Sequence, residues 1–162
     1  PVEEDEFIDK DINIRDYLHE IISSFKEISK KEFVFNFDQD SNSKKITKSI
    51  ELVYGLRNFI GNANKFAKNT IFINLKSDSE ITEITVEDDG DGYPRDIISK
   101  IGEPYLKSNY SKDKSKEGLG LGLFIGKTLL EKNFASVNCR NSKTRNGAEV
   151  VIRWKNKELF NI

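Results

Sequence analysis

The sequence predicts an α+β domain, a two-layer sandwich in which helices cover one face of a mostly antiparallel, mixed sheet. Three stretches place apolar residues at helical spacing, and several shorter stretches alternate apolar with polar residues as strands do. These elements do not follow the strict strand–helix alternation that an all-parallel sheet requires. At 162 residues, the chain has the length of one domain with its own core.

The elements are expected in a definite order along the chain. A helix over residues 11–31 is followed by a strand at 32–38, a polar loop at 39–45 and a second helix at 46–68. Two strands at 70–75 and 81–88 follow, and then a short helix and loop within 90–118. The last elements are a helix at 123–132 and two strands at 135–141 and 147–154.

The composition restricts the class of protein. Lys and Arg total 26 against 27 Asp and Glu, so no net field favours nucleic acid or an anionic membrane. The single cysteine, Cys139, cannot form an internal disulfide, and no apolar run approaches the roughly 18 residues of a membrane span. A reducing, cytosol-like compartment is expected. The absence of Met is consistent with a piece excised from a longer protein, with residues 1–11 as a linker and 157–162 as a tail.

Three polar side chains of the second helix share one face. Asn58, Asn62 and Lys65 stand at i, i+4 and i+7, opposite the apolar side of the helix. A solvated surface would explain them, but asparagine is a mediocre helix former. An amide oxygen can also ligate Mg²⁺, and an ammonium can meet a phosphate.

An aspartate is expected to face the core at the end of the strand over residues 81–88. Alternation places Asp88 on the same face as Ile84 and Val86. An inward carboxylate needs hydrogen-bond donors, and Gly90 and Gly92 allow a backbone or a flat ring to come close. Asp88 could cap its own turn, or it could accept a hydrogen bond from an exocyclic amine such as adenine N6.

The glycine-rich stretch "KEGLGLGLFIGK" precedes an apolar helical run. It lacks the first glycine of a Walker motif, and no strand leads into it as a dinucleotide fingerprint requires. A flexible turn before a helix N-terminus would offer N–H groups to a phosphate, whereas packing or a hinge would also account for the glycines.

The three motifs in this order resemble the ATP-binding fold of gyrase, Hsp90, MutL and the histidine kinases. "NFIGNANKF" is similar to the N box, "DDGDG" to the G1 box, "GEPY" to a variant F box, "GLGLGL" to the G2 box and "NGA" to the last glycine motif. The resemblance extends over residues 12–154. Within the histidine kinases, "GLGLGLFIGKTLLE" and "IRW" are most similar to the RegB/PrrB/ActS redox-responsive type.

The resemblance implies a role for each matched position. Asn62 would ligate Mg²⁺, Lys65 would meet the phosphates, and Asp88 would bind the adenine amine. Asn58, Asn62 and Lys65 would form the catalytic set, with residues 106–117 as the ATP lid. The remaining ATP-binding positions would be Gly90, Gly92, Ile101, Tyr105, Lys107, Gly118, Leu119, Gly120, Leu121 and Gly122.

The residue at position 58 indicates the type of reaction. ATPases of this superfamily have a glutamate there as a general base, whereas an asparagine cannot accept a proton at neutral pH. The resemblance therefore implies transfer of the γ-phosphoryl group of Mg-ATP to a histidine on a separate dimerisation domain. His19 lacks the continuation of a phosphoacceptor motif, so residues 12–156 are expected to be the catalytic domain alone.

Partners and compartment follow from the same resemblance. The expected partners are the protein's own dimerisation domain and a cognate response regulator, and nucleic acid is not expected. Contact with a bacterial inner membrane would occur only through a part that this chain lacks. The domain itself would be cytoplasmic. An anti-sigma-type serine kinase of the same fold and a nucleotide-binding regulatory module without transfer activity remain alternatives.

Three further residues qualify the resemblance. Gly102 and Ala148 replace the Phe and Thr of many kinases, which affects lid packing and the adenine side of the pocket. Cys139, in a strand pattern, is expected to be a small core residue.

Overall fold

A five-stranded sheet forms the centre of the computed structural model, which describes residues 11–38, 45–98 and 119–160. Its strand order is β2-β4-β5-β7-β6, and only the β2–β4 pair is parallel. The strands are β2 (Glu32–Phe37), β4 (Thr70–Ser77), β5 (Ile81–Asp88), β6 (Ser136–Asn141) and β7 (Ala148–Lys155).

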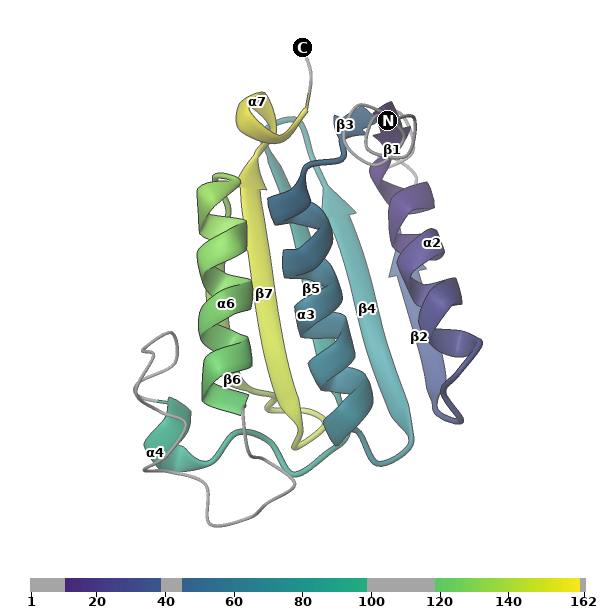
Figure 1. The fold of residues 1–162 in the computed structure, drawn as a ribbon, viewed down its shortest axis with the longest axis vertical. Helices are drawn as coiled ribbons and strands as arrows, with labels where there is room; N and C mark the ends of the chain where they lie inside the picture. The colour runs from purple at the N-terminus through teal and green to yellow at the C-terminus, as the bar shows by residue number, and fades with distance from the viewer. Residues whose placement is uncertain (1–10, 39–44, 99–118, 161–162) are drawn as a thin grey trace.

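Three long helices cover one face of this sheet (Figure 1). They are α2 (Ile14–Lys26), α3 (Ile50–Phe66) and α6 (Leu119–Lys132), with α3 lying between the other two. The predicted α+β sandwich with helices on one face is therefore confirmed. Two short helices, α4 (Arg95–Ile98) and α7 (Asn156–Leu159), follow β5 and β7. None of the described helices is both long and apolar enough to cross a membrane.

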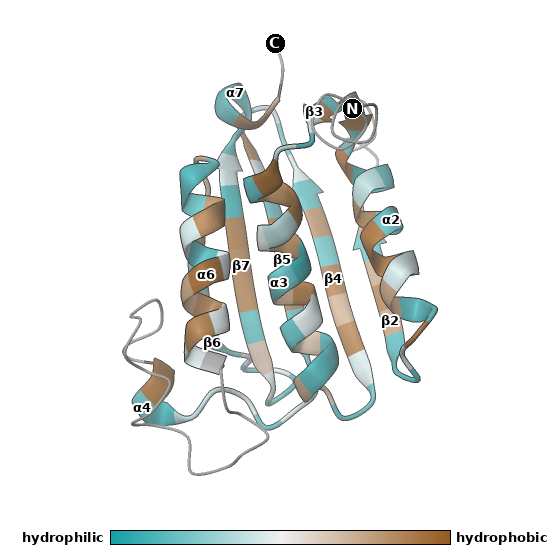
Figure 2. Ribbon diagram, viewed as in Figure 1, coloured by the Kyte–Doolittle hydropathy of each residue, from teal (hydrophilic) through white to brown (hydrophobic). Residues whose placement is uncertain are grey.

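The core lies between the sheet and the helices. Figure 2 shows apolar and polar residues alternating along the strands, as expected for a sheet with one buried face. Ile73 and Ile84 on the sheet and Leu56 on α3 are fully buried. Burial of each such side chain contributes about 1.5–3 kcal/mol, so α3 is held mainly by its apolar stripe. That stripe contains Leu52, Val53, Leu56, Ile60 and Ala63.

The opposite face of the sheet carries ion pairs between neighbouring strands. Arg153 of β7 donates to Glu83 of β5, with an Nη2–Oε2 distance of 2.6 Å, and Arg140 of β6 pairs with Glu149 of β7. These ion pairs account for some of the many charged residues of the chain. They lie on the solvent side of the sheet, where each pair contributes little to stability.

The two first helices begin later than the sequence predicts. Residues 11–13 and 45–47, expected to lie in helices or a loop, form β1 (Asp11–Asn13) and β3 (Lys45–Thr47), a separate antiparallel pair. Helix α2 starts after Asn13, whose side chain accepts from Arg15 N, and α3 starts after Ser49, which accepts from Leu52 N at 3.1 Å. Both are N-cap hydrogen bonds that mark a helix start.

Other helix boundaries also differ from prediction. Helix α2 ends at Lys26 rather than residue 31, and α3 ends at Phe66 rather than residue 68. Helix α6 begins at Leu119 rather than Leu123, so Gly120 and Gly122 lie in its first turns and not in a preceding loop. The segment expected to be a tail includes most of α7. The domain boundaries at residues 12 and 156 stay predictions.

Two glycines allow α3 and α6 to pack closely. A Cβ added at Gly55 of α3 would lie 2.6 Å from Leu130 Cγ of α6, and a Cβ at Gly126 of α6 would lie 2.9 Å from Phe59 Cε2 of α3. Each helix therefore places a large side chain where the other has none. The interaxial distance of a helix pair depends on such side chains.

We expect Gly55→Ala to destabilise the domain, because the added methyl group conflicts with buried Leu130. Overpacking of this kind costs about 1–3 kcal/mol, which outweighs the roughly 0.5–1 kcal/mol that alanine gains over glycine within a helix. Urea denaturation of the variant and the parent chain measures the difference.

Gly61→Ala is the matched control in the same helix. Its added Cβ would meet Phe25 Cζ at 3.5 Å, an ordinary contact, so this variant should be as stable as the parent or more stable. Equal stability of the two variants would show that α3 and α6 are not held at this distance by Gly55.

Candidate functional site

Four segments that carry the predicted motifs meet at one end of the sandwich. Figure 1 places the C-terminal ends of α3 and β5, the N-terminal end of α6 and the β6–β7 turn at this end. Asp88 is the last residue of β5, while Asn62 and Lys65 lie in the last turns of α3. The fold thus brings together motifs that are far apart in the sequence.

Asp88 is a buried carboxylate, as its position in the strand predicts. Its side chain is on the helix side of the sheet, and the residue is only 4% exposed. Oδ1 accepts from Gly90 N at 2.8 Å and from Ala148 N at 3.3 Å. No described residue donates a hydrogen bond to Oδ2, so that oxygen can accept a hydrogen bond from a ligand.

Burial raises the pKa of Asp88, because it disfavours the charged form. The Gly90 and Ala148 N–H groups lower the pKa, and the neighbouring carboxylates of Asp89 and Glu87 raise it, but burial has the largest effect. The site therefore holds a carboxylate that is under-satisfied in the protein alone. A donor on a bound ligand would stabilise its ionised form.

Glycines surround Asp88 where the backbone segments come closest. A Cβ at Gly147 would lie 1.9 Å from the carbonyl oxygen of Asp88, and one at Gly90 would lie 2.3 Å from that of Phe66. Gly92 has φ of +80°, a conformation that other residues rarely adopt. Side chains at Gly90 and Gly147 would push the backbone apart around Asp88.

Asp89 has the opposite environment to its neighbour. Although burial raises its pKa, hydrogen bonds from the backbone N–H groups of Asn69, Thr70 and Lys68 outweigh that effect and lower the pKa. Its carboxylate accepts from Lys68 N at 2.8 Å and Asn69 N at 3.0 Å. Asp89 therefore fixes the connection between α3 and β4, a role that the sequence analysis did not assign.

Asn58 and Asn62 face helix α6 and are both partly buried. Asn62 Nδ2 lies 3.4 Å from Asn58 Oδ1, and a Cβ at Gly122 would lie 3.6 Å from Asn62 Nδ2 and 3.7 Å from Asn58 Oδ1. The amide pair therefore lies beside the first turns of α6 instead of on a fully solvated surface. Gly122 leaves the space above both amides open.

Lys65 is exposed at the end of α3, with its ammonium 5.2 Å from the centroid of the Phe66 ring. Gly120, Leu121 and Gly122 lie in α6, where Leu121 is 37% exposed and Gly120 is buried. Leu119 is the first residue of α6. Ile101, Tyr105, Lys107, Gly118 and the predicted lid at 106–117 lie outside the described residues.

Two polar contacts beside the site were not predicted from the sequence. Tyr93 N donates to Asn141 Oδ1 at 2.7 Å, and Asn141 Nδ2 donates to the Tyr93 carbonyl oxygen at 3.1 Å. This reciprocal pair ties the segment after β5 to the end of β6. Only the asparagine at a strand end could have suggested it, because the two residues are far apart in sequence.

Cys139 packs against the core, as expected from its strand pattern. Burial raises the pKa of its thiol to about 12, and a hydrogen bond with Tyr93 lowers it less. The thiol is therefore protonated at neutral pH and is a poor nucleophile. His19 is exposed on α2, with its ring edge-on to Phe35 at 4.8 Å between centroids.

In the part of the chain that the structure describes, no group of three or more His, Cys, Asp and Glu side chains could hold a metal ion. The oxygen ligands that the site offers near α6 are side-chain amides.

The structure is an α+β sandwich with a buried aspartate at the end of one strand. Residues 47–158 match the family model described as histidine kinase-, DNA gyrase B- and HSP90-like ATPase. The chain belongs to this family, and an ATPase domain of this kind implies nucleotide binding.

Within this family, the chain is similar to sensor histidine kinases. The chain is 38% identical over 108 residues to the sensor histidine kinase RegB of Cereibacter sphaeroides, a match that covers 64% of this chain and 23% of RegB. The predicted similarity to RegB and to histidine kinase ATP-binding domains is confirmed. The chain spans less than a quarter of the length of that relative.

Solved structures show the same fold at lower identity. The catalytic domain of histidine kinase ThkA has a TM-score of 0.73 at 20% identity, covering 90% of this chain and 96% of that domain. Full-length ShkA, solved in complex with AMPPNP, has a TM-score of 0.71 at 20% identity, covering 90% of this chain and 30% of ShkA.

We expect Asp88→Asn to stabilise the fold at neutral pH. Because the pKa of Asp88 is raised in the folded state, stability is lost as the pH rises through that raised pKa. Asparagine keeps an oxygen for the Gly90 and Ala148 donors and removes the charge. The variant should melt higher than the parent at pH 7.5, on the order of a few degrees.

The difference in melting temperature between Asp88→Asn and the parent should shrink as the pH falls below the raised pKa towards the ordinary carboxyl range. There, Asp88 becomes neutral in the parent as well. Thermal melts at several pH values measure it. An Asp88→Asn variant that melts below the parent at neutral pH would show that the ionised carboxylate stabilises the fold.

Proposed function

We propose that this chain is the catalytic domain of a RegB-type sensor histidine kinase. It binds Mg-ATP between α3, the end of β5 and the start of α6, and it transfers the γ-phosphoryl group to a histidine of a separate dimerisation domain. The observation that carries the proposal is the buried Asp88, whose Oδ2 is left available at the same end of the fold as the Asn58–Asn62 amide pair.

Asp88 would recognise the adenine base. Its Oδ2 would accept a hydrogen bond from the exocyclic amine, while Oδ1 keeps its bonds to Gly90 and Ala148. Gly90 and Gly147 support this role, because they keep the backbone around Asp88 free of side chains. A base that lacks an amine at this position would leave the carboxylate without its donor, so adenine should be preferred to guanine.

The amide pair and α6 would hold the phosphates. Asn62 already directs its Nδ2 towards Asn58, which leaves Asn62 Oδ1 for Mg²⁺. The donor set fits, since a neutral amide oxygen and phosphate oxygens are ligands that Mg²⁺ accepts. When bound, Mg²⁺ would neutralise charge on the phosphate oxygens. The N-terminal N–H groups of α6, next to Gly120 and Gly122, would meet the same phosphates.

Asn58 favours transfer over hydrolysis. Its amide cannot take a proton from water at neutral pH, so bound ATP would be hydrolysed slowly. The reaction then needs a better nucleophile. An imidazole nitrogen would attack the γ-phosphorus as the bond to the β–γ bridging oxygen breaks, and ADP would leave. Lys65, at the end of α3, would contribute positive charge near the phosphates.

The partners proposed for the whole protein are its own dimerisation domain and a cognate response regulator that receives the phosphoryl group. The name of RegB as a sensor histidine kinase and the AMPPNP complex of ShkA support this assignment. Nucleic acid is not proposed as a partner, and a cytoplasmic position in a bacterial inner-membrane protein is proposed by analogy with sensor kinases. No described contact favours a serine kinase.

The reaction can be tested with radiolabelled ATP, this chain and a dimerisation domain from a RegB-type kinase. Label should appear on the dimerisation domain in an acid-labile, base-stable form, which identifies phosphohistidine. Nucleotide binding with no transfer to any such domain would instead favour the regulatory module, and an acid-stable label on serine would favour the serine kinase.

Asn62→Ala should remove most of the effect of Mg²⁺ on nucleotide affinity. We expect the variant to bind ADP without Mg²⁺ about as well as the parent does. The factor by which Mg²⁺ raises ADP affinity should be at least about tenfold smaller in the variant than in the parent. Calorimetric titration with and without Mg²⁺ measures both affinities.

Asn74→Ala is the control, because Asn74 lies on the other face of the sheet and contacts Asn36. It should leave the Mg²⁺ effect unchanged. A full Mg²⁺ effect in Asn62→Ala would rule out Asn62 as the metal ligand.

A further inference from the structure

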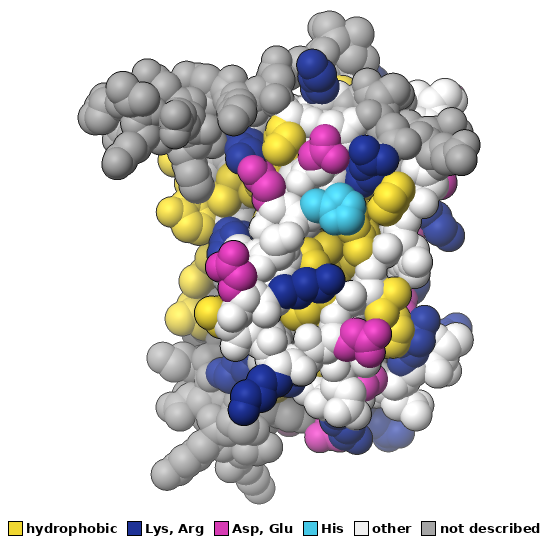
Figure 3. Space-filling model, turned by 90° about the vertical axis from the view of Figure 1, so that its right-hand side faces the viewer, with side chains coloured by type: hydrophobic (Ala, Val, Ile, Leu, Met, Phe, Trp, Pro, Cys, Tyr) yellow, Lys and Arg dark blue, Asp and Glu magenta, His cyan; other side chains and the backbone are white. Residues whose placement is uncertain are grey.

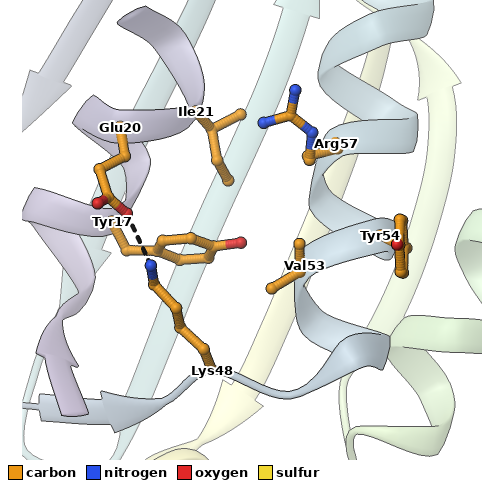
Figure 4. Close-up of a pocket in the computed structure, with 7 residues that line it drawn as sticks. All are labelled: Tyr17, Glu20, Ile21, Lys48, Val53, Tyr54 and Arg57. Carbon is orange, nitrogen blue, oxygen red and sulfur yellow. Dashed lines mark ion pairs between the residues drawn. The ribbon is translucent and has the colours of Figure 1, made fainter. Parts of the chain in front are cut away.

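A groove between α2 and α3 forms a second concave site. Its volume is about 350 Å³, within the range of small-molecule pockets. The groove lies on the opposite side of α3 from α6, and Figure 4 shows side chains from both helices converging on it. Its lining residues are Tyr17, Glu20, Ile21, Lys48, Val53, Tyr54 and Arg57.

The Tyr17 hydroxyl in this groove lacks a hydrogen-bond partner among the described residues. Tyr17 is only 3% exposed, and Figure 4 shows its hydroxyl directed from α2 towards α3. Buried polar groups in native proteins almost always have a partner. Burial raises the pKa of this hydroxyl, so it stays protonated and can donate a hydrogen bond.

The charges around the groove leave one cation in excess. Lys48 pairs with Glu20 at 3.0 Å, with its ammonium 5.1 Å from the Tyr17 ring centroid. Arg57 has no carboxylate partner within the described part of the chain. Its guanidinium donates to Ser24 Oγ at 3.1 Å and lies 5.3 Å from the Phe25 ring centroid. The groove therefore matches an anion with a single charge.

The remaining walls are apolar. Ile21 and Val53 are buried on the two sides, and Tyr54, which is 54% exposed, lies at the rim. The surface around the groove shows no large field of one sign, since Figure 3 shows cations and carboxylates interspersed on this side of the molecule. An extended polyanion thus has little to bind here, whereas a small apolar molecule with one acidic group fits.

We propose that this groove binds a small carboxylate with an aromatic or aliphatic body. One carboxylate oxygen accepts from the Tyr17 hydroxyl and the other from the Arg57 guanidinium. The body lies against Ile21, Val53 and the Tyr54 ring. This site is separate from the nucleotide site, and binding to it requires neither ATP nor a phosphoacceptor.

The test uses the ¹⁵N-labelled 162-residue chain without nucleotide. Phenylacetate, 3-phenylpropanoate and 4-phenylbutanoate are titrated while backbone amide signals are recorded, and the neutral amide of each acid serves as its matched control. At least one acid should cause saturable shifts centred on Tyr17, Lys48, Val53 and Arg57, at about millimolar affinity. The corresponding amide should bind at least about fivefold more weakly.

Two variants distinguish the proposed contacts from non-specific binding. Tyr17→Phe removes only the hydroxyl, and Arg57→Gln removes the charge, so each should weaken binding of the acid about fivefold or more. Arg95→Gln, on α4, loses the same charge away from the groove and should bind as the parent does.

Three results would overturn the proposal. They are the absence of saturable shifts with all three acids, equal binding of acid and amide, and unchanged affinity in both groove variants.

Discussion

The close contact between α3 and α6 is the constraint on which the rest of the site depends. Leu130 fills the space over Gly55, and Phe59 fills the space over Gly126, so the two helices interlock along their length. This packing brings the first turns of α6 next to Asn58 and Asn62, which face it one turn apart on α3. Gly55 and Gly126 therefore set the distance between the N-terminus of α6 and the two side-chain amides of α3.

The adjacent residues Asp88 and Asp89 differ in how their ionised forms affect the stability of the fold. Asp89 accepts three backbone donors and has a lowered pKa, so its ionised form stabilises the fold above the acidic range. Asp88 has a raised pKa and an oxygen without a described donor, so its ionised form costs stability. Such a cost is typical of residues retained for binding.

Local patterns were sufficient to predict the sandwich and the orientation of its main side chains. Alternation in β5 placed Asp88 on the core side, and the apolar stripe of α3 is the one predicted from helical spacing. These predictions succeed because one buried face determines the side-chain pattern of a whole element.

What the sequence did not predict depends on contacts between distant segments. Ile46 fits a helical pattern, yet it pairs with Ile12 in a small sheet, and α3 begins only after Ser49. Gly120 and Gly122 indicated a loop by propensity, but α6 includes them because tertiary packing outweighs a local cost of about 1 kcal/mol per glycine. The Ala148 donor to Asp88 and the donors to Asp89 come from segments distant in sequence, so they could not be predicted. The Gly90 donor to Asp88 is local and fits the turn cap that the sequence offered.

The most direct test of the account is a calorimetric titration of AMPPNP and of GMPPNP, both with Mg²⁺, into this chain and into its Asp88→Asn variant. We expect the parent chain to bind AMPPNP and to bind GMPPNP at least about tenfold more weakly, and the variant to lose most of its affinity for AMPPNP. Equal affinity of the parent for the two nucleotides, or unchanged binding by Asp88→Asn, would contradict the assignment of Asp88 as the adenine-recognising residue.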